Sequence, residues 1–153
     1  MGKLKMRALI QRVKHASVDI EGRSHNHIGP GLLILLAVHK NDGENDAEYL
    51  AGRCADLRIF SDGEGKMNLS VRGTGGSALV ISQFTLYADT RKGNRPSFTD
   101  SAAADAAEKL YDVFVARLRQ HLGDARVCTG KFRAMMDVGL VNDGPVTVML
   151  ESK

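Results

Sequence analysis

A chain of 153 residues is long enough for one domain with a real core, since a domain of this length buries roughly two-thirds of its unfolded surface. Hydrophobic residues make up 43% and charged residues 25%, which argues against disorder, and no apolar run approaches the roughly 20 residues of a membrane helix. The net charge is only +3, but basic residues gather at 1–14 and 91–95, where they could meet nucleic-acid phosphates or simply be solvated.

The first half of the chain predicts strands and one helix. These are strands at residues 6–13, 17–20 and 32–38, the first two forming a hairpin, and a helix capped by Asn45 or Asp46 that ends near Leu57. The run from Leu32 to Val38 is apolar on both faces, as in a central strand that is covered on both sides.

The second half predicts a hairpin, a longer helix and further strands. In order, these are a hairpin joining residues 58–60 to 67–69, a strand at 78–82, a helix from Ser101 to Leu122, and strands at 126–129, 137–141 and 146–150. No repeat or linker interrupts the chain, so we predict a single α+β domain over residues 1–153, with two helices and a sheet as its larger part.

The cysteines and histidines predict no metal site. Cys54 and Cys128 lie far apart without further ligands at metal spacing, so neither zinc nor a disulfide is expected, and both should be small buried residues. The five histidines fall in turn-like or exposed contexts. No metal or cofactor is therefore predicted, and the absence of an export signal with this cysteine usage predicts a cytoplasmic location.

Three segments are more polar or more basic than their context requires. Ser82-Gln83-Phe84-Thr85-Leu86 ends an apolar strand with two hydroxyls and an amide, Asn142-Asp143-Gly144-Pro145-Val146-Thr147 combines four strong turn formers, and residues 91–98 form a basic loop. Taken alone, the first two have ordinary explanations as a strand end and a turn. The chain has no Gly-x-Ser-x-Gly elbow and no His-Glu-x-x-His, so a hydrolase here would act without a His-activated nucleophile.

The segments SQFTL at 82–86 and NDGPVT at 142–147 resemble the two signature motifs of the D-aminoacyl-tRNA deacylase family. The flanking segments RALIQRVKHASV, GLLILLAV, LRIFSDGEGKMNL and ADTRKGNRPSF are also similar to that family, in the same order. The resemblance covers nearly the whole chain from Met6 to Ser152. It departs before Met6, where we expect a flexible extension at residues 1–5, and at Ala37 and Arg133, where the family typically has glycine.

The resemblance implies a homodimer of barrel-like subunits, each with a mainly antiparallel β-sheet, and an active site at the subunit interface. It implies hydrolysis of the ester in D-aminoacyl-tRNA, and of glycine mischarged on alanine tRNA, with rejection of L-aminoacyl-tRNA. Because Arg133 departs from the pattern beside the expected pocket, it bears on pocket shape and substrate range.

Site residues carry over by position. Ser82, Gln83, Phe84 and Thr85 would line the pocket around the ester, with backbone N–H groups near Phe84 and Thr85 stabilising the oxyanion. Water would attack, assisted by the terminal ribose hydroxyl, with Thr85 as a positioning group.

The remaining residues would act around that centre. Gly144 and Pro145, joined by a cis bond in the family, would enter from the partner subunit and exclude an L side chain, and Arg12 would brace their loop. Met135 would shape the pocket wall or pack in the core. Lys92 and Arg95 would contact tRNA phosphates.

Two other functions fit the residues. One is an amidase or esterase for small molecules with Thr85 as nucleophile, which would hydrolyse free D-amino acid esters as well as the tRNA form. The other is a basic, β-rich module that binds nucleic acid without catalysis, and it would bind tRNA whatever amino acid is attached.

Overall fold

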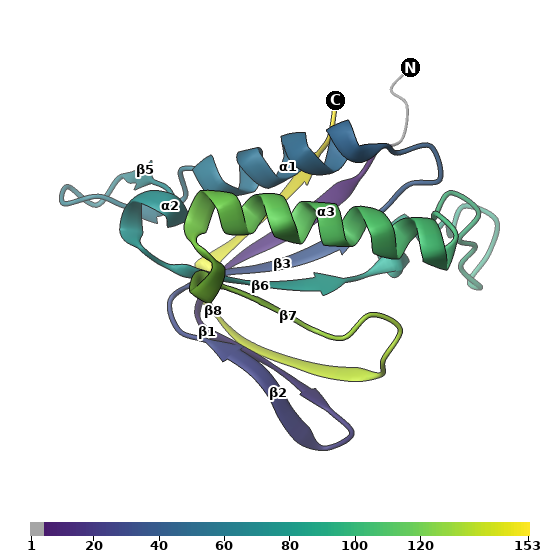
Figure 1. Ribbon diagram of the computed structural model, residues 1–153, viewed down its shortest axis with the longest axis horizontal. Coiled ribbons are helices and arrows are strands. Elements are labelled where there is room, and N and C mark those ends of the chain that lie inside the picture. Colours follow the sequence, from purple (N-terminus) through teal and green to yellow (C-terminus); the bar gives the residue numbers. More distant parts are fainter. Residues whose placement is uncertain (1–4) are drawn as a thin grey trace.

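The computed structural model describes residues 5–153 (Figure 1). Of the extension expected at residues 1–5, all but Lys5 lies outside the described residues. In chain order the elements are β1 (Arg7–Ile20), β2 (Arg23–Ile28), β3 (Gly31–Ala37), α1 (Glu44–Asp56), β4 (Phe60–Ser61), β5 (Met67–Leu69), α2 (Val71–Thr74), β6 (Ser77–Ser82), η1 (Phe84–Tyr87), α3 (Ala104–Leu122), η2 (Asp124–Arg126), β7 (Val127–Thr129) and β8 (Met136–Glu151).

Six strands form one mixed, barrel-like sheet in the order β2-β1-β3-β6-β7, with β8 paired to β1. The pairs that involve β1 are antiparallel, whereas β3–β6 and β6–β7 are parallel. Helices α1 and α3 lie side by side on one face, and the far halves of β1 and β8 curl with β2 around the other (Figure 1). The α+β prediction with a mainly antiparallel sheet is confirmed.

The core has two parts because β3 and β6 are covered on both faces. Toward the helices, Ile34 and Val80 pack with Phe114 of α3, which is fully buried. Toward the curled strands, Leu33, Leu79 and Ile81 pack with buried residues of β1 and β2. The prediction that residues 32–38 form a central, doubly covered strand is confirmed.

β1 is one strand of 14 residues, so the predicted hairpin between residues 6–13 and 17–20 is wrong. Its hairpin partner is β2, reached through Glu21 and Gly22, both with positive φ. The apolar alternation breaks near Val13 because the pairing with β8 shifts register there, as in a β-bulge. A bulge inside one strand had the sequence signature of a turn between two.

β8 likewise runs unbroken for 16 residues through the segment read as a turn at 142–147. The predicted strands 137–141 and 146–150 are therefore parts of one strand. Opposite Arg12, the chain between Asn142 and Thr147 bulges out of the ladder, because Asn142 pairs with Val13 and Thr147 with Gln11. The Asn142 side chain closes this bulge: its Oδ1 accepts from Val146 N at 2.7 Å. The turn-forming residues shape a bulge on a long strand.

Three smaller predictions also need correction. Two helices were predicted, but the chain also has a short third helix, α2, which Ser70 caps by accepting a hydrogen bond from the Gly73 N–H at 3.0 Å. His39, expected in a turn-like or exposed context, begins a turn but is buried, and its Nδ1 accepts a hydrogen bond from Asn41 N at 3.1 Å. Cys54 is buried as expected, whereas Cys128 is only partly buried.

Within residues 5–153, none of the helices has the length and apolarity needed to cross a membrane.

Candidate functional site

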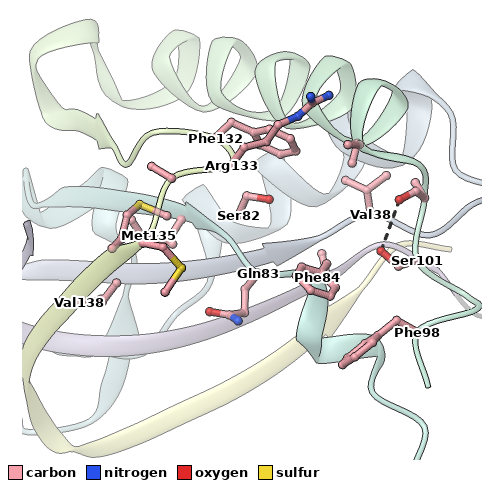
Figure 2. Close-up of a pocket in the computed structure, with 17 residues that line it drawn as sticks. Val38, Ser82, Gln83, Phe84, Phe98, Ser101, Phe132, Arg133, Met135 and Val138 are labelled. Atoms are coloured by element: carbon pink, nitrogen blue, oxygen red, sulfur yellow. Dashed lines mark hydrogen bonds between the residues drawn. The ribbon is translucent and has the colours of Figure 1, made fainter. Parts of the chain in front are cut away.

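A cavity of about 650 Å³ opens where β6 ends (Figure 2). Its walls come from the end of β3, the segment after β6, the start of α3 and the loop before β8. The residues that line it are Ala37, Val38, Ile81, Ser82, Gln83, Phe84, Phe98, Ser101, Ala102, Ala104, Ala107, Phe132, Arg133, Ala134, Met135, Met136 and Val138. The volume is in the range of sites that enclose a small organic molecule.

The first signature motif forms one wall of this cavity. Gln83 leaves the strand but stays anchored, because its N–H donates to Leu36 O at 2.8 Å. Phe84 then begins the turn η1, with 55% of its surface exposed and its ring 5.0 Å from that of Phe98 in an edge-to-face contact. Thr85 is exposed and does not line the cavity, but its Oγ1 accepts a hydrogen bond from Gln83 Nε2.

The opposite wall is the loop at residues 130–135. Phe132 packs against Tyr111, whose hydroxyl donates to Val80 O at 2.7 Å and so ties α3 to β6. Met135 lines the cavity rim with 89% of its surface exposed, so of its two expected roles, core packing is excluded. The sequence around Phe132 does not indicate a role in the cavity wall, because only the fold brings Phe132 close to the first signature motif.

Arg133 is the only ionisable side chain among the described residues that line the cavity. Its backbone φ of 69° lies in the left-handed region, and its Nη2 is 2.5 Å from Asp105 Oδ1 in the first turn of α3. The cavity therefore has apolar and neutral polar walls with a single cation at its rim.

The second signature motif lies elsewhere on the same chain. Arg12 Nε donates to Asp143 O at 2.7 Å and its Nη1 donates to Ile59 O at 2.7 Å, so the guanidinium ties β8 to the segment before β4. Gly144 and Pro145 follow, exposed and joined by a cis peptide bond.

Arg12, Gly144 and Pro145 do not line the cavity. The bulge lies opposite Arg12, which pairs with Leu32 of β3, whereas Ser82 in the cavity wall pairs with Leu36 of the same strand. These four residues of β3, at ~3.3 Å per residue, separate the bulge from the cavity wall by about 13 Å along the strand direction. The structure of one chain thus brings Ser82, Gln83, Phe84 and Met135 together and keeps the second motif apart from them.

The basic loop lies beside the first motif. Lys92 and Arg95 are exposed, and neither forms an ion pair with any residue in the described range 5–153. Arg91 instead pairs with Asp89, Nη2 to Oδ2 at 2.7 Å, and these hydrogen bonds lower the pKa of Asp89 to about 2. Lys92 and Arg95 therefore remain available to a ligand.

No group of three or more His, Cys, Asp or Glu side chains that could hold a metal occurs among residues 5–153.

A family model and proteins of similar sequence point to the same family. A family model described as D-Tyr-tRNA(Tyr) deacylase matches residues 9–151. Proteins named D-aminoacyl-tRNA deacylase from Thermosipho melanesiensis and Klebsiella pneumoniae are 53% and 58% identical, over 97% and 95% of this chain and 98% and 99% of their own.

Two solved structures share the fold. The structure of a protein named c-Myc DNA Unwinding Element Binding Protein has a TM-score of 0.92 at 37% identity, covering 96% of this chain and 99% of that one. A structure described as a "probable eukaryotic D-amino acid tRNA deacylase" has a TM-score of 0.84 at 18% identity, over 97% and 100% of the two chains, and shows the fold alone. With a family model spanning most of the chain and relatives above half identity, the chain belongs to the D-aminoacyl-tRNA deacylase family.

Proposed function

We propose that this protein hydrolyses the ester bond of D-aminoacyl-tRNA to free tRNA and a D-amino acid, and that it rejects L-aminoacyl-tRNA. The observation that carries the proposal is the cavity at the end of β6, where Ser82, Gln83 and Phe84 of the signature motif face Phe132 and Met135. Relatives with at least 53% identity over nearly their whole length are named for this activity. Glycine mischarged on alanine tRNA is a further substrate, since glycine has no side chain to exclude.

The chemistry is addition and elimination at the ester carbonyl. Water adds to the carbonyl carbon, the tetrahedral oxyanion collapses, and the ribose oxygen leaves with a proton. Phe84 and Thr85 begin the turn η1, and the first N–H groups of a helical turn have no hydrogen-bond partner within it. We therefore assign the backbone N–H groups of Phe84 and Thr85 as the donors that stabilise the oxyanion. One such donor is typically worth about 10²–10³ in rate.

Thr85 acts as a positioning group in this scheme. Its hydroxyl is held by Gln83 Nε2, and none of the described residues lining the cavity is a His, Asp or Glu that could activate it. The terminal ribose hydroxyl of the tRNA assists the attacking water instead. The reaction as written uses no metal or cofactor.

Chiral selection requires Gly144 and Pro145, and we propose that a second copy of the chain supplies them. Within one chain the bulge that carries them lies about 13 Å along β3 from the cavity wall. Both residues are exposed, and Arg12 fixes the carbonyl just before them. Backbone groups held this rigidly beside the substrate Cα would leave no room for an L side chain, so selection works by exclusion.

The deciding experiment compares hydrolysis of D-Tyr-tRNA and L-Tyr-tRNA by the wild type and by Pro145→Ala. Cleavage of the D form alone supports the proposal, and loss of this preference in the variant supports the role of Pro145. Absence of cleavage with tRNA still bound would favour a nucleic-acid-binding module, the kind of role for which the 37%-identical protein is named. Equal cleavage of free D-amino acid esters would favour a small-molecule esterase.

Mixed dimers test the shared site. Phe84→Ala and Pro145→Ala damage different halves of the proposed site, so a heterodimer of the two keeps one intact site. Random pairing of equal amounts gives about a quarter of the wild-type site count, since half of the dimers are mixed and each has one good site. Activity no higher than that of the separate variants would place both halves within one chain.

We also propose that Lys92 and Arg95 contact tRNA phosphates and that the protein works in the cytoplasm, where aminoacyl-tRNA is used. Replacing both by Gln should weaken tRNA binding and reduce the slope of log affinity against log salt by about 1.4–1.8. An unchanged slope would remove both residues from the interface.

A further inference from the structure

Arg133 stands out because a long charged side chain occupies a backbone position suited to glycine. Its φ of 69° lies in the left-handed region, which disfavours residues with a Cβ atom. Glycine would adopt this φ without strain, so the backbone of the loop does not require an arginine at this position. A side chain kept in an unfavourable backbone conformation at a cavity rim is a reason to look for a role in binding.

The position of the guanidinium suggests what it binds. Figure 2 shows Arg133 reaching from its loop toward the start of α3, at the edge of the cavity. The other residues that line the cavity are apolar or uncharged. A cavity of about 650 Å³ can take an aminoacyl nucleoside but little more, so the phosphate that joins this nucleoside to the rest of the RNA must lie at the mouth.

The ion pair with Asp105 is suited to exchange. The Arg133 side chain is 55% exposed and that of Asp105 is 97% exposed, and ion pairs as exposed as this contribute little stability. One Nη atom of Arg133 contacts Asp105, which leaves further N–H donors for a phosphate. Asp105 also lies in the first turn of α3, where the helix dipole stabilises a carboxylate without the arginine.

We propose that Arg133 is a specificity-determining residue that binds the phosphate 5′ to the esterified nucleoside, exchanging Asp105 for it when substrate enters. This inference rests on the proposed function. It makes the phosphate next to the reacting end a recognised part of the substrate, so the enzyme would favour an aminoacyl nucleotide over the same aminoacyl nucleoside.

The test uses two small substrates, the D-tyrosyl ester of adenosine and the D-tyrosyl ester of adenosine 5′-monophosphate, both attached through the ribose 3′ oxygen. The measured quantity is the ratio of kcat/KM for the phosphorylated ester to that for the other. A charged hydrogen bond to phosphate predicts a wild-type ratio of about ten. Arg133→Gly should bring the ratio toward one, and Arg133→Lys should give an intermediate value because lysine keeps the charge but lacks the fork.

Asp105→Asn separates phosphate binding from a structural role of the ion pair. If Arg133 binds the phosphate, Asp105→Asn removes the carboxylate that competes for the guanidinium, so the kcat/KM ratio stays equal or rises. If the ion pair only holds the loop in place, Asp105→Asn lowers the ratio as Arg133→Gly does. Arg117→Ala is the matched control, since it removes a 37% exposed arginine from its ion pair with Glu48, and neither of these residues lines the cavity. Its ratio should equal that of the wild type.

Each outcome is decisive. Three results would overturn the inference while leaving the deacylase proposal intact. They are a ratio near one in the wild type, an undiminished ratio in Arg133→Gly, and parallel losses in Arg133→Gly and Asp105→Asn. If the wild type cleaves neither of the two small esters and does not cleave D-Tyr-tRNA, the proposed function itself is overturned. Far-UV circular dichroism and the unfolding midpoint of each variant show whether it is folded.

Discussion

Replacing Arg12 by methionine removes the guanidinium that ties the Gly144-Pro145 bulge to the rest of the fold while keeping an unbranched side chain of similar length. The side chain is only 12% exposed and donates to the carbonyls of Asp143 and Ile59, both at 2.7 Å. A hydrogen bond from a charged donor contributes about 1.5–3 kcal/mol. Ile59 is buried, so its carbonyl loses a partner, whereas water can reach the partly exposed Asp143.

These terms predict a loss of about 2–4 kcal/mol in the free energy of unfolding for Arg12→Met. The contact with the Asp143 carboxylate, at 3.8 Å and 45% exposed, adds little. Urea unfolding at a fixed protein concentration measures the loss. Arg58→Met is the matched control: Arg58 is exposed and its Nε makes one hydrogen bond, to Asn68 O at 3.1 Å, so about 1 kcal/mol or less is expected.

The same variant should change selectivity. Freed from Arg12, the carbonyl of Asp143 no longer fixes the two residues that follow it, so the ratio of D-Tyr-tRNA to L-Tyr-tRNA cleavage should fall at a protein concentration and temperature where the variant is folded. Equal destabilisation in Arg12→Met and Arg58→Met, or an undiminished D-to-L ratio in a folded Arg12→Met, would refute the bracing role.

Local geometry makes three further predictions. Gly31→Ala should lower the free energy of unfolding, measured in urea, by at least about 3 kcal/mol or prevent folding, because its Cβ would lie 1.8 Å from a carbonyl oxygen of β6. Gly29→Ala is the control: its Cβ would have no atom within 4 Å, so the urea midpoint should change little. Burial raises the pKa of Cys54 to about 12, so a thiol reagent at pH 8 should modify it only after unfolding, as mass spectrometry would show; rapid labelling of the native protein would contradict the buried position. Arg91 holds the pKa of Asp89 at about 2, below its usual 3.8. Their pairing therefore stabilises the folded loop above about pH 4, and this contribution is lost as the pH falls through about 2. In Arg91→Gln the pKa of Asp89 should return toward 3.8, which an NMR titration would measure.

Much of the fold was predictable from local pattern. The central strand is apolar on both faces, the two long helices have apolar stripes, and the hairpin of β4 and β5 has glycines in its turn, so each element carries its own signature. The continuity of β1 and β8 was not predictable, because their bulges depend on the opposite strand. Polar and turn-forming residues at a bulge have the same composition as those at a turn.

The candidate site divides in the same way. Ser82, Gln83 and Phe84 were identifiable because polar residues at the end of an apolar strand are unusual and matched a known motif. Phe132 and the start of α3 join them only through parallel pairing and helix packing, which no local pattern encodes. The exposure of Met135 and the distance of Gly144-Pro145 from the cavity likewise needed the fold.

The pairing of β1 with β8 has a consequence for how the chain acquires its fold during synthesis. Arg7 pairs with Glu151, and Ser152 N donates to Met6 O at 3.0 Å, so the first long strand waits for the last. Until β8 leaves the ribosome, one edge of β1 stays unpaired along its whole length and can recruit other chains. The sheet should therefore close only after β8 has been synthesised. Joining Ser152 to Met6 through a short linker and opening the chain at the exposed β4–β5 turn would give a circular permutant in which β8 and β1 are synthesised one after the other and can pair early.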